Sequence, residues 1–159
     1  MTSIDANELK RDLHEAVEHG NSELVQELLE MGAETEDLLI LASQEGNADV
    51  VRMLLDAGAH VNQATTDDGR TPLFIASLND NADVVRMLLD AGADVNQATT
   101  DYGTTPLYIA SERGKADVVR MLLDAGADVN QATTDDGRTP LYNASGYGKA
   151  DVVRMLLDA

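Results

Sequence analysis

Histidines and acidic turns are the residues of this chain whose types could support chemistry. The three histidines, His14, His19 and His60, form no i, i+4 pair on one helix face, and the 159 residues include no cysteine. Zinc sites are built from imidazoles and thiolates in such patterns, so we expect none here. The histidines also lie in the first half, and no order of serine, histidine and aspartate suggests a catalytic triad. We therefore predict a protein that is not an enzyme and has no metal site.

Two further motifs are similar to ligand-binding loops but lack the residues that bind. The segments Thr65–Gly69 and Thr133–Gly137, both TTDDG, place paired carboxylates beside a glycine. A calcium loop needs alternating ligands over about twelve residues and a distant glutamate, which is absent, so we interpret these segments as turns. In SGYGKAD, Ser145–Asp151, a phosphate loop would have glycine in place of Asn143 and serine or threonine in place of Ala150. The sequence predicts no cofactor.

The composition is strongly acidic and poor in aromatic residues. The formal net charge is −18. A field of this sign repels phosphate backbones and anionic membranes, so we expect neither nucleic acid nor membrane as a partner. It favours a protein partner with a basic surface, although solubility alone would also account for it. Hydrophobic residues make up 43% and aromatic residues 3% of the chain, which indicates an aliphatic core between closely packed helices.

We expect no signal peptide and no membrane span in this sequence. Its start, MTSIDANELK, has neither a basic n-region nor an apolar h-region, and the longest apolar run, LLILA, is far shorter than a membrane span. A chain without cysteine suits a reducing compartment, so we predict an intracellular, cytoplasmic protein. An engineered scaffold would have the same features.

One segment recurs every 34 residues. The sequence ADVVRMLLDAGADVNQATTD occupies residues 82–101 and is repeated without change at 116–135. A copy at 48–67 differs only at His60, and a fourth begins at Ala150. Tandem units of this length stack on their neighbours, because one unit cannot bury its apolar face alone. The repeat therefore predicts a solenoid.

Each unit has the pattern of two helices followed by a polar turn region. Thr71 is a good N-cap and Pro72 a good first helical residue, so we expect a first helix that starts at Pro72 and ends near Asp80. The second helix, residues 81–92, has an apolar stripe formed by Val84, Val85, Leu88 and Leu89. Polar residues follow Gly92 and form an extended loop or hairpin that leads to the next Thr-Pro pair.

Recurring motifs mark the start and the end of each helix pair. TPLFIAS, TPLYIAS and TPLYNAS begin at Thr71, Thr105 and Thr139, and VVRMLLDAGADVN begins at Val84 and Val118. With this order of helix, turn, helix and hairpin, nearly the whole chain resembles the ankyrin-repeat family. The resemblance implies an all-α ankyrin-repeat solenoid of about five stacked helix-turn-helix units joined by β-hairpin-like loops.

The chain departs from the pattern of that family in three ways. Its period is 34 residues, whereas ankyrin repeats usually have about 33, so we expect a hairpin tip that is longer by one residue. The histidine that usually follows TPL is replaced by Phe74, Tyr108 and Tyr142. The hairpin between the first two units is missing, because residues 32–42 form a much shorter connection than residues 58–76.

These features divide one ankyrin-repeat domain, residues 1–159, into five units. Residues 1–34 are an N-terminal capping unit with a polar outer face, and 35–66 are a second unit that lacks the preceding hairpin. Residues 67–100 and 101–134 are regular units, and 135–159 are a terminal unit without a C-terminal cap. At this end we expect partial exposure of Leu141, Val152, Val153 and Leu156. Either a natural continuation is absent or this end self-associates.

The regular units differ on the descending arm of the hairpin, on the first helix and in the turn after it, while their second helices are nearly invariant. In the family that the chain resembles, hairpin tips and first helices line a concave groove that binds proteins. We therefore predict that the partner-binding residues are Asp68, Arg70, Leu78, Asn79, Asp80, Tyr102, Thr104, Tyr108, Glu112, Arg113, Asp136, Arg138, Tyr142, Asn143 and Tyr147. Tyrosine and arginine are the residue types that dominate interface energetics.

The aromatic residues of this strip have two interpretations. Phe74, Tyr108 and Tyr142 follow TPL, and we expect them to pack internally beneath the hairpins in place of the family's histidine, rather than to face a partner. For Tyr102 and Tyr147 we expect exposure at the surface.

Asp80 replaces the glycine that joins the two helices in the other units. We expect it to adopt the left-handed conformation at a cost of about 1 kcal/mol relative to glycine. It is explained either by drift at a tolerant turn or by selection for a partner.

The sequence thus predicts a protein–protein interaction module. The alternative is a structural or assembly unit that forms a weak homodimer through its C-terminal face. The uniform second helices fit either a recent duplication of the repeats or an engineered consensus framework.

Overall fold

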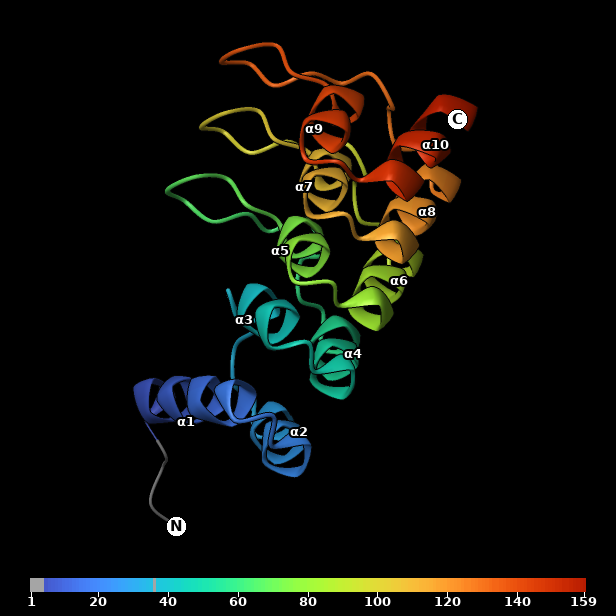
Figure 1. The fold of residues 1–159 in the computed structure, drawn as a ribbon. Helices are drawn as coiled ribbons and strands as arrows, with labels where there is room; N and C mark the ends of the chain where they lie inside the picture. The colour runs from blue at the N-terminus through green and yellow to red at the C-terminus, as the bar shows by residue number, and fades with distance from the viewer. Residues whose placement is uncertain (1–4, 36) are drawn as a thin grey trace.

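The computed structural model describes residues 5–35 and 37–159, and in this part of the chain the regular secondary structure is helical. The helices form pairs that stack in chain order, with first helices in one column and second helices in another (Figure 1). The first helices are α1 (Ala6–Glu18), α3 (Leu38–Glu45), α5 (Pro72–Leu78), α7 (Pro106–Arg113) and α9 (Pro140–Gly146). The second helices are α2 (Ser22–Glu30), α4 (Ala48–Asp56), α6 (Ala82–Asp90), α8 (Ala116–Asp124) and α10 (Ala150–Asp158). The predicted all-α solenoid is confirmed.

Threonine and proline start the first helices of the last three units, as predicted. The Oγ1 atom of Thr71 accepts a hydrogen bond from the N–H of Phe74 at 3.1 Å. Thr105 caps α7 in the same way at 3.1 Å, and proline follows each threonine as the first helical residue. These caps satisfy one of the backbone donors that a helix start leaves without a partner. α5 ends at Leu78, two residues before the predicted end.

The second helices α4, α6, α8 and α10 share the sequence ADVVRMLLD and bury the same stripe. In α6, Val84, Val85 and Leu88 are fully buried, and Leu89 is half-buried. The predicted apolar stripe is therefore confirmed. One aliphatic core runs from Leu13 to Leu156, because each helix pair covers the apolar side of the preceding one.

The exposure of the last helix pair differs from the prediction. Leu141 and Val153 are half-buried as expected, but Val152 and Leu156 are only 1% and 4% exposed. They are covered because α10 packs against α8 and α9. The exposed apolar side chain of α10 is Leu157, at 67%, which the sequence did not single out.

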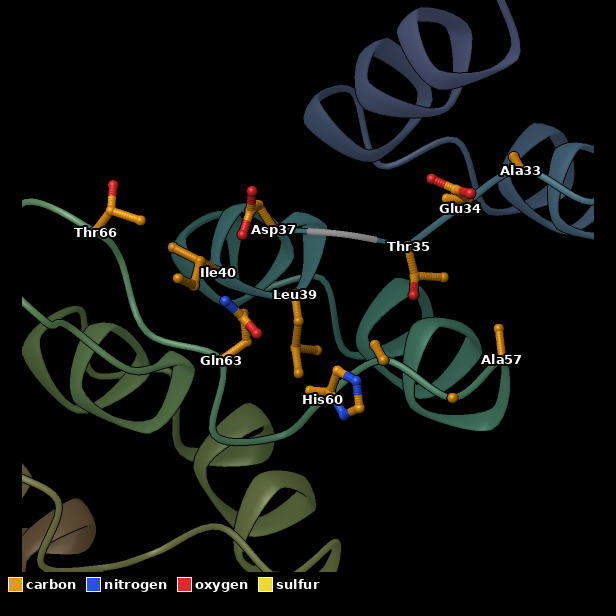
Figure 2. Close-up of a pocket in the computed structure, with 12 residues that line it drawn as sticks. Ala33, Glu34, Thr35, Asp37, Leu39, Ile40, Ala57, His60, Gln63 and Thr66 are labelled. Atoms are coloured by element: carbon orange, nitrogen blue, oxygen red, sulfur yellow. The ribbon is translucent and has the colours of Figure 1, made fainter. Parts of the chain in front are cut away.

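The connections between units are of two kinds. Residues 57–71, 91–105 and 125–139 form long loops that extend from the column of first helices, on the side away from the second helices (Figure 1). Each tip is closed by a backbone hydrogen bond, for example from the N–H of Thr99 to the carbonyl of Thr104 at 3.0 Å. The connection from α2 to α3 comprises only residues 31–37, and a cleft lies between it and the first long loop (Figure 2).

Asp80 adopts the left-handed conformation, as predicted, with φ at 63°. Gly46 and Gly114 occupy the same turn in neighbouring units with φ at 72° and 69°. The carboxylate of Asp80 lies 3.5 Å from Nζ of Lys115 in the next unit. Asp80 thus makes a contact within the chain that glycine could not make.

We expect Asp80→Gly to stabilise the chain by about 0.5–1 kcal/mol, because glycine removes the left-handed strain. The gain lies toward the lower value, since a partly exposed ion pair worth at most about 1 kcal/mol is lost. Urea denaturation of both proteins measures the effect. In a Lys115→Ala background the same substitution should gain more, because no ion pair remains to be broken. A lower midpoint for Asp80→Gly in that background would contradict the strain argument.

Candidate protein-binding surface

The long loops and the first helices beside them form one continuous surface, which we call the hairpin face. It consists of the exposed parts of residues 62–70, 96–104 and 130–138 together with half-buried Leu78 at the end of α5, the exposed side chains of α7 and α9, and those of the turns that follow these helices. Successive loops are joined by backbone hydrogen bonds. The N–H of Thr100 donates to the carbonyl of Asp68 at 2.8 Å, and the N–H of Thr134 donates to that of Tyr102 at 2.9 Å. The loops therefore hold one another in place.

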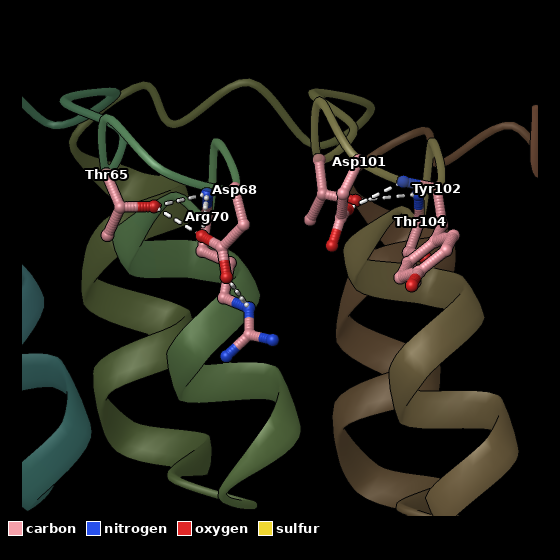
Figure 3. Close-up of polar contacts among 7 residues, drawn as sticks. Thr65, Asp68, Arg70, Asp101, Tyr102 and Thr104 are labelled. Carbon is pink, nitrogen blue, oxygen red and sulfur yellow. Dashed lines mark hydrogen bonds and ion pairs between the residues drawn. The ribbon is translucent and has the colours of Figure 1, made fainter.

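A threonine organises the tip of each loop. Oγ1 of Thr65 accepts from the N–H of Arg70 at 2.9 Å and donates to Oδ1 of Asp68 at 2.6 Å (Figure 3). Thr133 makes the same two contacts with Arg138 and Asp136, at 3.1 and 2.8 Å. A short polar side chain thus fixes both arms of the loop, as is typical of turns built by threonine and aspartate.

The middle loop replaces this aspartate by Tyr102 and recruits the residue before it. Oδ1 of Asp101 accepts from the N–H of Tyr102 at 2.6 Å, and Oγ1 of Thr99 accepts from the N–H of Thr104 at 3.0 Å (Figure 3). Because Asp101 supplies the carboxylate, the side chain of Tyr102 takes no part in closing the loop and is 58% exposed. The exchange frees an aromatic ring at the centre of the hairpin face.

Hydrogen bonds keep the tip carboxylates ionised. The hydroxyl of Thr99 lowers the pKa of Asp101, and that of Thr133 lowers the pKa of Asp136. The backbone N–H groups of Asp67 and Asp68 lower the pKa of Asp67. Donors that favour the charged form have this effect on a carboxyl group. An aspartate with its ordinary pKa is already ionised at neutral pH, so these hydrogen bonds extend the negative charge of the loop tips to lower pH.

Two arginines are held between a carboxylate and an aromatic ring of their own unit. Nε of Arg70 lies 2.8 Å from Asp68, and its Cζ is 5.7 Å from the centroid of the Phe74 ring. In the last unit the corresponding distances, to Asp136 and to the ring of Tyr142, are 2.7 and 5.4 Å. Stacking and pairing restrict these side chains before any partner binds, which lowers the entropy cost of using them in an interface.

Family comparison agrees with the stacked helix pairs. The model for ankyrin repeats (three copies) matches residues 13–99 and 97–159. The chain belongs to the ankyrin-repeat family. Ankyrin repeats are generally protein–protein interaction modules and are typically not enzymes. A search of curated proteins found no match to this chain.

Residues 5–35 and 37–159 contain no group of three or more histidine, cysteine, aspartate or glutamate side chains that could hold a metal ion. Within the same residues, no helix combines the length and the apolar character that crossing a membrane requires.

The structure divides the predicted partner-binding residues of the ankyrin units by burial. The exposed ones are Asn79, Asp80, Tyr102, Arg113, Asp136, Arg138, Tyr142 and Tyr147. The half-buried ones are Asp68, Arg70, Leu78, Thr104 and Glu112. Tyr108 and Asn143 are only 8% and 3% exposed. Their side chains are therefore not available to a partner, which corrects the prediction for these two residues.

Internal packing of the residue after TPL depends on the neighbouring ankyrin unit. Phe74 and Tyr108 are buried, as we expected, at 5% and 8% exposure, but Tyr142 is 60% exposed. The difference arises because α7 packs between α5 and α9, whereas α9 has its main contacts with α7 and α10. The expectation was thus wrong for Tyr142, whose ring joins Tyr102 and Tyr147 at the surface. Tyr102 and Tyr147 are exposed as predicted, at 58% and 63%.

Asn143 forms a buried polar contact that links two ankyrin units. Its Nδ2 donates to Oε2 of Glu112 in α7 at 2.7 Å. One unit earlier, the equivalent positions hold Leu78 and Ile109, which belong to one apolar cluster. From one unit to the next, the apolar pair Leu78 and Ile109 is thus replaced by the hydrogen-bonded pair Glu112 and Asn143 at the same positions. The sequence analysis did not pair these two residues, although the change from an apolar to a polar residue at both positions was a signal that they are in contact.

Proposed function

We propose that this ankyrin-repeat chain binds a protein partner through its hairpin face. The observation that carries the proposal is the gathering of exposed aromatic side chains there, namely Tyr102, Tyr142 and Tyr147. The exposed positions that vary between the regular units lie on the same face, whereas the second helices have one sequence. Rings that are already exposed and held on a rigid framework are the residue type that most often supplies binding energy at an interface.

The charge of the chain supports a partner with a basic surface. The net charge is −18, and the loop tips carry ionised carboxylates whose pKa is lowered, including Asp67, Asp101 and Asp136. Such a field accelerates the encounter with a cationic surface and is screened by salt. We place this binding in the cytoplasm, whose reducing environment suits a chain without cysteine.

Tyr102→Ala is expected to weaken partner binding about 30-fold, since a central aromatic residue contributes about 2 kcal/mol. The immobilised chain would capture partners from a lysate, mass spectrometry would identify them, and calorimetry with the purified partner would give the dissociation constants. Arg120→Ala is the matched control, because Arg120 is exposed on α8 and lies outside the hairpin face. A partner that binds Tyr102→Ala and Tyr147→Ala as tightly as the original chain would place the interface elsewhere.

The alternative function, an assembly unit, is favoured by one observation. Leu157 is 67% exposed on α10 and borders a shallow hollow of about 470 Å³ that also includes Val153 and Arg154. Sedimentation distinguishes the two functions. A dimer that forms with rising concentration and is lost on Leu157→Glu, or on adding a polar C-terminal cap, would support assembly. A monomer at all concentrations would leave partner binding as the function.

A further inference from the structure

The cleft at the N-terminal end of the loop array has a volume of about 510 Å³. One wall is the connection before α3, which includes Thr35 and Asp37, and the other is the first loop, which includes His60 and Thr66 (Figure 2). Leu39 of α3 also lines it. The cleft lies where a loop of the first unit would stack if the connection from α2 to α3 were as long as the others.

In the following units the same edge of each loop is covered by the preceding loop through two hydrogen bonds. The N–H of Asp94 donates to Oδ1 of Asn62 at 2.8 Å, and the N–H of Thr100 donates to the carbonyl of Asp68 at 2.8 Å. One unit later, Asn96 and the carbonyl of Tyr102 accept from Asp128 and Thr134 in the same way, at 2.8 and 2.9 Å. Each loop thus offers two acceptors, an asparagine side chain and, six residues later, a carbonyl.

In the first loop the corresponding donors are the N–H groups of His60 and Thr66. Neither donates a hydrogen bond to any residue in the described ranges 5–35 and 37–159. Burial agrees with an uncovered edge: Thr65 is half-buried, whereas its equivalents Thr99 and Thr133 are only 6% and 7% exposed. Gln63 is exposed, whereas the equivalent glutamines of the next two loops are half-buried. The array therefore ends in an open edge beside a preformed cleft.

We propose that the cleft binds a loop segment of a partner protein that turns as the chain's own loop tips do and takes the place of the missing loop. The segment presents an asparagine side chain to the N–H of His60 and, six residues later, a main-chain carbonyl to the N–H of Thr66. This occupant follows from the molecule's own chemistry, because the chain covers the identical edge with such a segment in the next two units. Unpaired backbone groups at an edge are a general site of peptide recognition.

The residues around the cleft favour an uncharged or cationic segment. Glu34 and Asp37 line it, and His60 stands where the other loops have Asp94 and Asp128. The polar recognition elements of the covering loops are an asparagine and a carbonyl, which add no charge beside these two carboxylates. This proposal extends the protein-binding function but does not depend on Tyr102, since the cleft lies at the opposite edge of the first loop.

Hydrogen exchange of the free protein tests whether the edge of the first loop is uncovered. We expect the amide of Thr66 to exchange faster than those of Thr100 and Thr134, which donate to the preceding loop. Equal protection of all three amides would show that the edge is already covered and would overturn the proposal.

A peptide titration tests whether the cleft binds a segment like the chain's own loops. The probe is a synthetic peptide with the sequence of residues 93–104, ADVNQATTDYGT, in which serine replaces Asp94 and Asp101 so that no carboxylate is brought to Glu34 and Asp37. It contains the asparagine and the carbonyl that cover the last unit. Addition to the ¹⁵N-labelled chain should shift the amide signals of His60 and Thr66 and leave those of Asp128 and Thr134 unchanged. A peptide with alanine in place of its asparagine should bind about five- to tenfold more weakly.

Two matched variants control the titration. Ala57 lines the cleft, whereas Ala91 is the equivalent exposed residue after α6 and lies outside it. Ala57→Trp should abolish the shifts, and Ala91→Trp should retain them. Absence of shifts at millimolar peptide, or equal shifts in both variants, would refute the cleft as a site. Failure of the hairpin-face proposal would appear separately, as a partner whose binding is insensitive to Tyr102→Ala.

Discussion

Leu122→Ala is expected to lower the free energy of unfolding by about 3–4 kcal/mol. Leu122 is fully buried in α8, which packs against α6, α7 and α10. Truncation removes apolar contacts on both sides of the unit and leaves a cavity that a row of short, interlocked helices cannot close. Urea denaturation followed by circular dichroism gives the free energy.

Leu156 is the matched control, because it occupies the same place in the same nine-residue sequence at the end of the array. It is 4% exposed, and α10 has its main contacts with α8 and α9. We expect Leu156→Ala to cost about 2 kcal/mol, since the last pair relaxes more easily. Leu157→Ala, at a position that is 67% exposed, should change stability by less than about 0.5 kcal/mol. Equal losses at Leu122 and Leu156 would contradict the idea that an inner unit is stabilised by the units on both of its sides.

Gly103→Ala is expected to cost about 2–3 kcal/mol, through strain and through collision with the next loop. Its φ is 67°, so any side chain is strained by about 1 kcal/mol. A Cβ atom at this position would lie 2.6 Å from Cγ2 and 3.0 Å from the backbone N of Thr134. The last loop must then move, and the hydrogen bond from Thr134 to Tyr102 is weakened. Thermal unfolding of the variant measures the loss.

Gly137 separates the two contributions. It has φ at 70°, and a Cβ atom there would meet no heavy atom within 4 Å. Gly137→Ala should therefore cost only the backbone strain, about 1 kcal/mol. The difference between the two substitutions measures the stacking of one loop on the next. No difference would mean that the loops contribute little to each other's stability.

The elements of the fold were predictable from the sequence because their signals are local. Thr71 and Pro72 mark a helix start, the stripe of Val84, Val85 and Leu88 marks a buried face, and Asp80 at a glycine position marks a left-handed turn. Each signal lies within a few residues and depends on backbone stereochemistry or helical spacing. The structure agrees with each of them.

The candidate site was less predictable because it depends on neighbours in space. Tyr108 and Tyr142 follow the same TPL motif, yet one is buried and the other exposed, and only the covering helix pair decides which. Asn143 was predicted to bind a partner, but its side chain reaches Glu112, which is 31 residues away in the sequence. The missing loop could be inferred from the short connection between the first two units. The uncovered backbone donors of His60 and Thr66, by contrast, follow only from how the other loops stack.

The backbone links between consecutive loops also bear on how the molecule responds to force. Each link joins only adjacent units, so tension applied at the two ends is carried in series through every one of them. The weakest junction would yield first and leave the remainder intact. Each release would lengthen the chain by roughly 115 Å, the extended length of the 34 residues in one repeat. Under load the protein would behave as a spring that extends in equal steps, in contrast to a globule that breaks once.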